Sequence, residues 1–170
     1  MKNNLTGELL TTKNNLLTAL DSFSNENINT VPFEGSWTGG QVARHVLKSA
    51  SGVSEALNGP AKTADRDPGQ HLKLLGDIFL NFDIKMKSPD FVLPDDEPKD
   101  KGALIQLLEK TFNNIIKVAE SEDLDMICTT FEMPNLGRLS KKEFIWFTIV
   151  HTQRHIHQLK NILNHLNQPN

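Results

Sequence analysis

The sequence has only one cysteine, Cys128, among its 170 residues. An intramolecular disulfide is therefore excluded, and a chain of this length must be stabilised by its own hydrophobic core. Sparse cysteine is typical of a reducing compartment, so we expect a cytoplasmic protein. The apolar content of 38% is ordinary for a globular protein. We therefore predict one domain covering residues 1–170.

Long apolar runs and an excess of positive charge are also missing. No segment reaches the roughly 18 apolar residues of a membrane-spanning helix, and residues 1–5 lack the apolar stretch of a signal peptide. The net charge is −3, with lysines and arginines scattered among acidic residues. Binding to a phosphate backbone requires a basic patch instead. We therefore expect no membrane segment and no nucleic-acid partner.

Apolar residues recur at helical spacing along four long segments. These stripes predict amphipathic helices near residues 3–24, 39–57, 103–120 and 140–166. Residues 38–41 (TGGQ) and 140–143 (SKKE) have the form of a capping box, which gives two of these helices well-defined starts. A shorter helix is predicted over 68–87, because Asp67 followed by Pro68 is typical of a cap and a first-turn proline.

The order of these segments predicts the fold class. The long helices, without a convincing strand pair, indicate an all-α four-helix bundle. The short helix would be an extra crossing element in the long connection between the second and third long helices. Residues 126–138 are rich in β-branched and turn-forming types, and we expect a loop there with a short extended piece.

His151 and His155 form an HxxxH pair within the last helix. Residues four apart differ by about 40° around a helix, so both imidazoles can reach one metal ion. Taken alone, such a pair is as readily an accident of a polar helix. However, Phe144 and Phe147 lie on the same face, which should therefore face the core. Buried imidazoles require polar partners, and a divalent metal is a suitable one.

His45 is the candidate third ligand. A catalytic zinc site usually has three protein ligands and one open position. On the second helix His45 is followed along its face by the small residues Ser49, Gly52 and Ala56, which would leave room beside an ion. The other three histidines fit less well and are interpreted as surface residues or as supports for the ligands: His71, His157 and His165.

Two polar residues near the pair are candidates for supporting roles. Gln158 shares the face of the pair, so it would hydrogen-bond to a ligand or, alternatively, to another helix. Arg154 would pair with a carboxylate, hold an anionic substrate or lie solvated at the helix edge. Possible general bases exist, but no spacing selects one of them: Glu55, Asp77 and Glu132.

With these residues in view, the sequence resembles the DinB superfamily, which includes YfiT-like metal-dependent hydrolases. The resemblance rests on Trp37-Thr38 opening a helix, His45 seven residues later, the HTQRHIHQL segment from His151, and KSPDF at residues 87–91. It implies an up-down-down-up four-helix bundle with three histidine ligands for nickel or zinc, and a homodimer. By this resemblance the ligands are His45, His151 and His155.

The resemblance also implies a class of chemistry. Characterised relatives include transferases and isomerases that use bacillithiol, mycothiol or glutathione. We therefore expect a metal-dependent enzyme whose ion activates a water or a low-molecular-weight thiol against a small-molecule substrate, as a hydrolase or a thiol S-transferase. The alternative is a non-catalytic helical-bundle module with a structural metal or a buried histidine cluster.

Overall fold

The computed structural model describes residues 2–168 of the chain and is predominantly helical. The four long helices are α1 (Lys2–Asp21), α2 (Gly39–Asn58), α4 (Lys101–Ser121) and α5 (Lys141–Leu166). The shorter elements are α3 (Leu72–Phe79), the 3-10 turns η1 (Asn27–Asn29) and η2 (Asp90–Val92), and the strands β1 (Ala61–Lys62) and β2 (Ile127–Cys128). All four predicted long helices are present, with ends that differ by a few residues.

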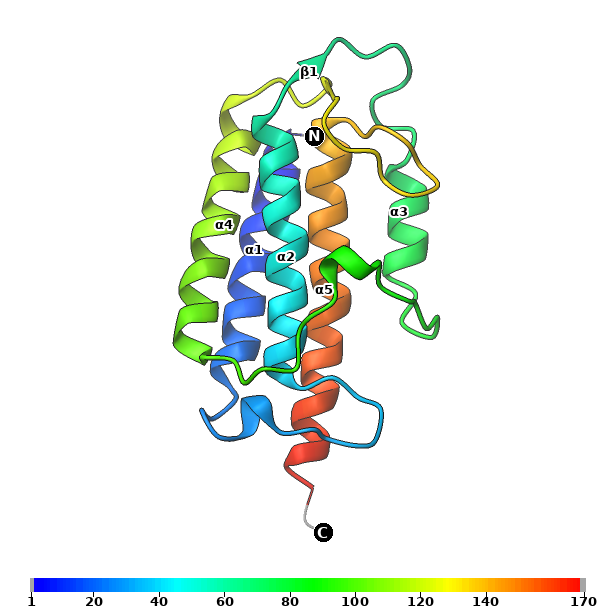
Figure 1. Ribbon diagram of the computed structural model, residues 1–170. Coiled ribbons are helices and arrows are strands. Elements are labelled where there is room, and N and C mark those ends of the chain that lie inside the picture. The colour runs from blue at the N-terminus through cyan, green and yellow to red at the C-terminus, as the bar shows by residue number, and fades with distance from the viewer. Residues whose placement is uncertain (1, 169–170) are drawn as a thin grey trace.

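The long helices form a bundle in which α1 and α5 run one way and α2 and α4 run the other (Figure 1). Each of α1 and α2 packs against both α4 and α5. The direction of the chain therefore follows the up-down-down-up order, and the predicted all-α four-helix bundle is confirmed. None of the described helices is long and apolar enough to cross a lipid bilayer.

Both predicted capping boxes are present. The Thr38 hydroxyl accepts from the Gln41 backbone N–H at 3.1 Å, and the Gln41 side chain accepts from the Thr38 N–H at 3.0 Å. Ser140 and Glu143 make the same exchange at the start of α5, at 3.1 and 2.9 Å. These caps satisfy free N–H groups of the first turn and so fix where each helix begins. They thereby set the position of every side chain that follows.

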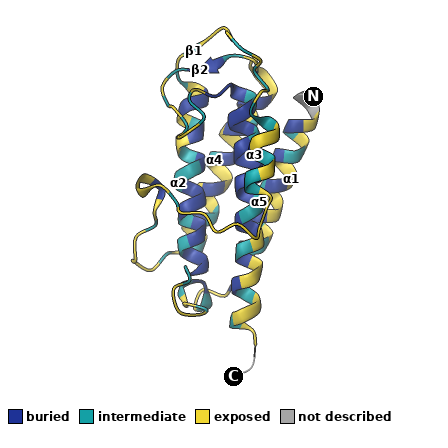
Figure 2. Cartoon of the chain, turned by 90° about the vertical axis from the view of Figure 1, so that its right-hand side faces the viewer, coloured by how far each residue is buried: buried dark blue, intermediate teal, exposed yellow. Residues whose placement is uncertain are grey.

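The apolar stripes of the long helices meet inside the bundle, as the dark-blue residues of Figure 2 show. The largest fully buried side chains include Phe23, Phe112 and Phe144. The C-terminal end of α5 extends beyond the other helices and is largely exposed (Figure 2). The histidine-bearing part of α5 therefore lies within the bundle, and its last turns do not.

The prediction of a helix over 68–87 was wrong in both of its ends. The Asp67 carboxylate accepts from the Gly69 N–H at 2.9 Å and stabilises a local turn, so α3 starts only at Leu72. The helix ends at Phe79, and the following residues have little regular structure apart from η2. Trp146 of α5 donates to the Leu72 carbonyl at 2.8 Å, which docks α3 alongside α5.

The expectation that no strands pair was also wrong. β1 and β2 form a two-residue antiparallel ladder, with Ala61 opposite Cys128 and Lys62 opposite Ile127. The predicted extended piece within 126–138 is β2. Cys128 is fully buried there, and burial raises the pKa of its thiol to about 11. A protonated, inaccessible thiol is a poor nucleophile and a poor metal ligand.

Candidate metal centre

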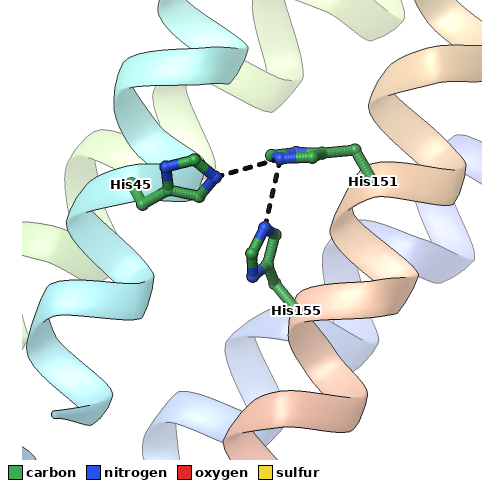
Figure 3. A group of neighbouring side chains, drawn as sticks. All are labelled: His45, His151 and His155. Carbon is green, nitrogen blue, oxygen red and sulfur yellow. Dashed lines mark hydrogen bonds between the residues drawn. The ribbon is translucent and has the colours of Figure 1, made fainter. Parts of the chain in front are cut away.

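His45, His151 and His155 meet between α2 and α5, two helices that pack directly against each other (Figure 3). The cap at Thr38 places His45 in the second turn of α2, and the other two histidines lie one turn apart in the middle of α5. All three are buried, with exposed fractions of 2%, 7% and 8%. The structure therefore brings together the three residues that the sequence singled out.

The three rings point their Nε2 atoms toward one another. The Nε2 atom of His151 lies 3.1 Å from Nε2 of His45 and 3.1 Å from Nε2 of His155 (Figure 3). The three potential ligand atoms all lie within 4.8 Å of one another. Two nitrogens bound to one zinc ion at about 2.0–2.1 Å in tetrahedral geometry are about 3.3 Å apart. The spacing of the donors therefore fits a single divalent ion.

The outer nitrogens of two rings have oxygen partners. Nδ1 of His45 lies 2.8 Å from the Val92 carbonyl, and Nδ1 of His155 lies 2.8 Å from Oε1 of Gln158. An oxygen of this kind only accepts, so each Nδ1 carries the proton and donates it. In a neutral imidazole the opposite nitrogen then has a free lone pair. Of the two partners considered for Gln158, the structure shows a histidine of the pair.

The inward-facing nitrogens consequently share very few protons. Nε2 of His45 and Nε2 of His155 both present lone pairs, and only Nε2 of His151 can carry a hydrogen in the neutral cluster. One hydrogen cannot lie in line with both of the 3.1 Å contacts that His151 makes. A cation between the three nitrogens would satisfy all of them at once. The donor set thus fits a metal ion.

Burial keeps the cluster neutral. Desolvation is the main cause that lowers the pKa of His155 to about 3, and the nearby His45 lowers it further. Desolvation, followed by the neighbouring imidazoles, also holds the pKa of His151 well below its ordinary value. The pKa of His45 is lowered by burial as well, although its bond to Val92 opposes the shift. Neutral imidazole is the form that binds metals.

Aromatic side chains surround the histidines. Trp37 lies against His45 with ring centroids 5.2 Å apart. Phe147 stacks on His151 at 5.1 Å, and Phe79 of α3 meets the same ring edge-on at 5.7 Å. An apolar wall restricts water and lowers the local dielectric, which strengthens the effect of any charge held there.

Arg154 has a different role from those expected of it. Its guanidinium donates to the Asn81 carbonyl at 2.8 Å and to the Ile84 carbonyl. Both partners are backbone oxygens of the chain that follows α3. Arg154 therefore fastens this chain to α5, while its charge contributes to lowering the pKa of His151 and His155.

The remaining histidines lie outside the cluster. His71 bonds through its ring to the side chain of Gln70 at 2.9 Å. His157 stacks on Phe82 with centroids 4.3 Å apart, and His165 is also exposed, near the end of α5. His71 is half-buried, and the other two are at the surface.

None of the three candidate acids lies at the cluster. Glu55 is exposed on α2. Asp77 pairs with Lys73 at 2.5 Å, and Glu132 pairs with Arg138 at 3.3 Å, both at the surface. These acids therefore do not serve as bases at the cluster in this conformation.

Two contacts near His45 are not indicated by any pattern in the sequence. Its partner, the Val92 carbonyl, is a backbone atom of a loop, which no side-chain pattern reveals. Lys48, three residues along the same helix, donates to the adjacent Leu93 carbonyl at 2.6 Å.

Gly52 was expected to leave room beside an ion, but it is exposed with open space around it. The space it leaves belongs to the surface of α2.

Comparison with known proteins agrees with this description. The sequence model of the DinB superfamily matches residues 8–159, which include most of the bundle and all three clustered histidines. No protein of curated function and no solved structure matches the chain. Because the family match covers most of its length, the chain belongs to the DinB superfamily.

Proposed function

We propose that this protein is a metal-dependent enzyme in which His45, His151 and His155 hold one divalent ion, nickel or zinc. The observation that carries the proposal is the convergence of three buried, neutral imidazoles through their Nε2 atoms. The absence of a carboxylate among the three candidate ligands leaves the full charge of the ion unneutralised. That favours ionisation of whatever neutral ligand binds next.

When bound, the ion would act as a Lewis acid that lowers the pKa of a water or of a low-molecular-weight thiol. The chain's own residues orient the histidine rings. Val92 and Gln158 hold the rings of His45 and His155 so that Nε2 points inward. The aromatic wall around His151 restricts bulk water. The resulting nucleophile would attack a small electrophile, as a hydrolase or a thiol S-transferase.

A panel of thiols separates these two reactions. The metal-loaded protein is mixed with an epoxide or a haloaromatic compound, with bacillithiol, mycothiol, glutathione or no thiol. Thiol-dependent turnover indicates an S-transferase, and hydrolysis without thiol indicates a hydrolase. His151→Ala should abolish either activity, whereas His165→Ala, which changes an exposed histidine near the end of the same helix, should leave it intact. Turnover that survives His151→Ala would refute the proposal.

A second candidate function is a non-catalytic module with a structural metal or a metal-free histidine cluster. The small exposed fractions of the three histidines, 2–8%, favour it, because a catalytic ion must be reached by its substrate. Cobalt substitution tests access to the ion. A change in the visible spectrum on adding azide or a thiol indicates an open position and favours the enzyme. A stable cobalt site whose visible spectrum is unchanged by both ligands favours the structural role.

The proposal includes a cytoplasmic homodimer. The single buried cysteine suits a reducing compartment. The dimer is implied by the resemblance described above. Light scattering coupled to size-exclusion chromatography measures the mass of the particle directly, and a mass of one chain would contradict the dimer.

A further inference from the structure

The chain that follows α3 is bonded both to Arg154 of α5 and to His45 of α2. We name residues 80–93 the strap; Figure 1 shows it in green, passing from the end of α3 in front of α5 and α2. Arg154 of α5 holds its first part through the Asn81 and Ile84 carbonyls. Its last part is held by α2. The strap therefore joins the two helices that carry the histidines.

One stripe of α2 makes the second attachment. His45 and Lys48 are three residues apart and so lie on the same face of the helix. Nδ1 of His45 bonds to the Val92 carbonyl at 2.8 Å, and Nζ of Lys48 bonds to the Leu93 carbonyl at 2.6 Å. A histidine and a lysine of one helix face thus hold two consecutive peptide groups of the strap.

The end of η2 explains why these carbonyls are available. The turn ends at Val92, so the carbonyls at its end lack partners within the turn. Val92 is buried, with an exposed fraction of 8%, while Leu93 is exposed at 37%. Lys48 therefore donates to the carbonyl of the more exposed of the two residues.

We propose that Lys48 is a positioning residue for the metal site. By holding Leu93 it keeps the adjacent Val92 carbonyl on Nδ1 of His45, and that bond keeps Nε2 free of a proton and directed toward the other histidines. If the Val92 carbonyl moves away, Nε2 can carry the proton instead, and this tautomer cannot bind a metal through Nε2. The inference deepens the proposed function and rests on it.

The charge of Lys48 alone would have the opposite effect on metal binding from its positioning role. Its ammonium group opposes positive charge at His45. If Lys48 acted only as a nearby charge, its removal would strengthen the binding of a divalent cation. A positioning role predicts weaker binding after its removal. The sign of the change therefore distinguishes the two roles.

Three variants make the test: Lys48→Met, Lys48→Arg and Lys13→Met. Lys13 is a matched control, because it also donates one hydrogen bond to a separate element, to Asn113 at 3.0 Å. Nickel and zinc affinities are measured by competition with a chelator. Groups that orient a metal ligand typically contribute 10- to 100-fold to affinity, so Lys48→Met should weaken binding by about 10-fold. Lys48→Arg should restore most of it, and Lys13→Met should change nothing.

A second measurement uses the metal-free protein. Nitrogen NMR of the His45 ring reports which nitrogen carries the proton. Wild type should show Nδ1–H, and Lys48→Met should show a substantial Nε2–H population. Unchanged or tighter metal binding with Nδ1–H retained would overturn the proposal. If wild type binds no metal, the proposed function fails, and the NMR result alone decides the role of Lys48. Lys48→Gln replaces the methionine variant if that variant does not fold.

Discussion

The buried histidines should make the metal-free protein sensitive to acid. The pKa of His155 is lowered to about 3 in the folded state, from an ordinary value of 6.5. The unfolded chain therefore binds more protons than the folded one between these values. The contribution of His155 to the free energy of unfolding is fully present above about pH 6.5 and is lost as the pH falls toward 3. The lowered pKa values of His45 and His151 act in the same direction.

The size of this effect follows from the shift. At pH 5 the solution is about 1.5 units below the unfolded pKa, and each unit corresponds to about 1.4 kcal/mol. His155 alone should therefore lower the free energy of unfolding by about 2 kcal/mol between pH 7.5 and pH 5. Because its exposed fraction is only 8%, little of this is reduced by solvent screening.

Urea denaturation in the presence of a chelator measures the effect. Wild type and His155→Gln are each unfolded at pH 7.5, 6 and 5, and the loss of stability on acidification is compared. The glutamine cannot gain a proton in this range, so its loss should be smaller by about 2 kcal/mol. His157→Gln, at the surface, should behave like wild type. Equal losses in wild type and His155→Gln would refute the buried, neutral imidazole.

Three other substitutions test separate parts of the structure. Gln158→Leu removes the acceptor of His155 and should weaken metal binding by about 10- to 100-fold in a chelator competition; unchanged affinity would contradict its orienting role. Glu143→Gln weakens the buried ion pair with Arg66 at 2.6 Å and should lower the free energy of unfolding by about 3 kcal/mol in urea denaturation; an unchanged free energy of unfolding would show that the pair does not stabilise the fold. Gly52→Ala meets no atom within 4 Å and should stabilise α2 by about 0.5–1 kcal/mol, whereas destabilisation would indicate contacts there.

The sequence was most informative where side chains act locally. The capping boxes that begin at Thr38 and Ser140 are local hydrogen-bond patterns, and both helix starts were predicted correctly. The HxxxH spacing predicted that His151 and His155 would share a face, because that relation depends only on helix geometry. That His45 lies against them depends on the packing of α2 on α5, which the apolar stripes and the family resemblance suggested.

Other features depend on contacts that a sequence pattern does not encode. Asp67 can cap either a helix or a turn, and in the structure its carboxylate accepts from the Gly69 N–H within a turn. The β1–β2 ladder pairs residues 61 and 62 with 127 and 128, too short for any alternation of side chains to appear. The bonds from His45 and Lys48 to the strap involve backbone carbonyls. Only the path of the chain in space brings these groups together.

The central claim is that three histidines bind one ion. Purified protein is reconstituted with nickel or zinc, freed of excess metal and analysed by mass spectrometry of the elements, alongside His45→Ala, His151→Ala and His155→Ala. The account predicts about one ion per chain in wild type and a marked loss of that ion in each variant. Wild-type protein without stoichiometric metal after reconstitution, or full metal content in all three variants, would contradict it.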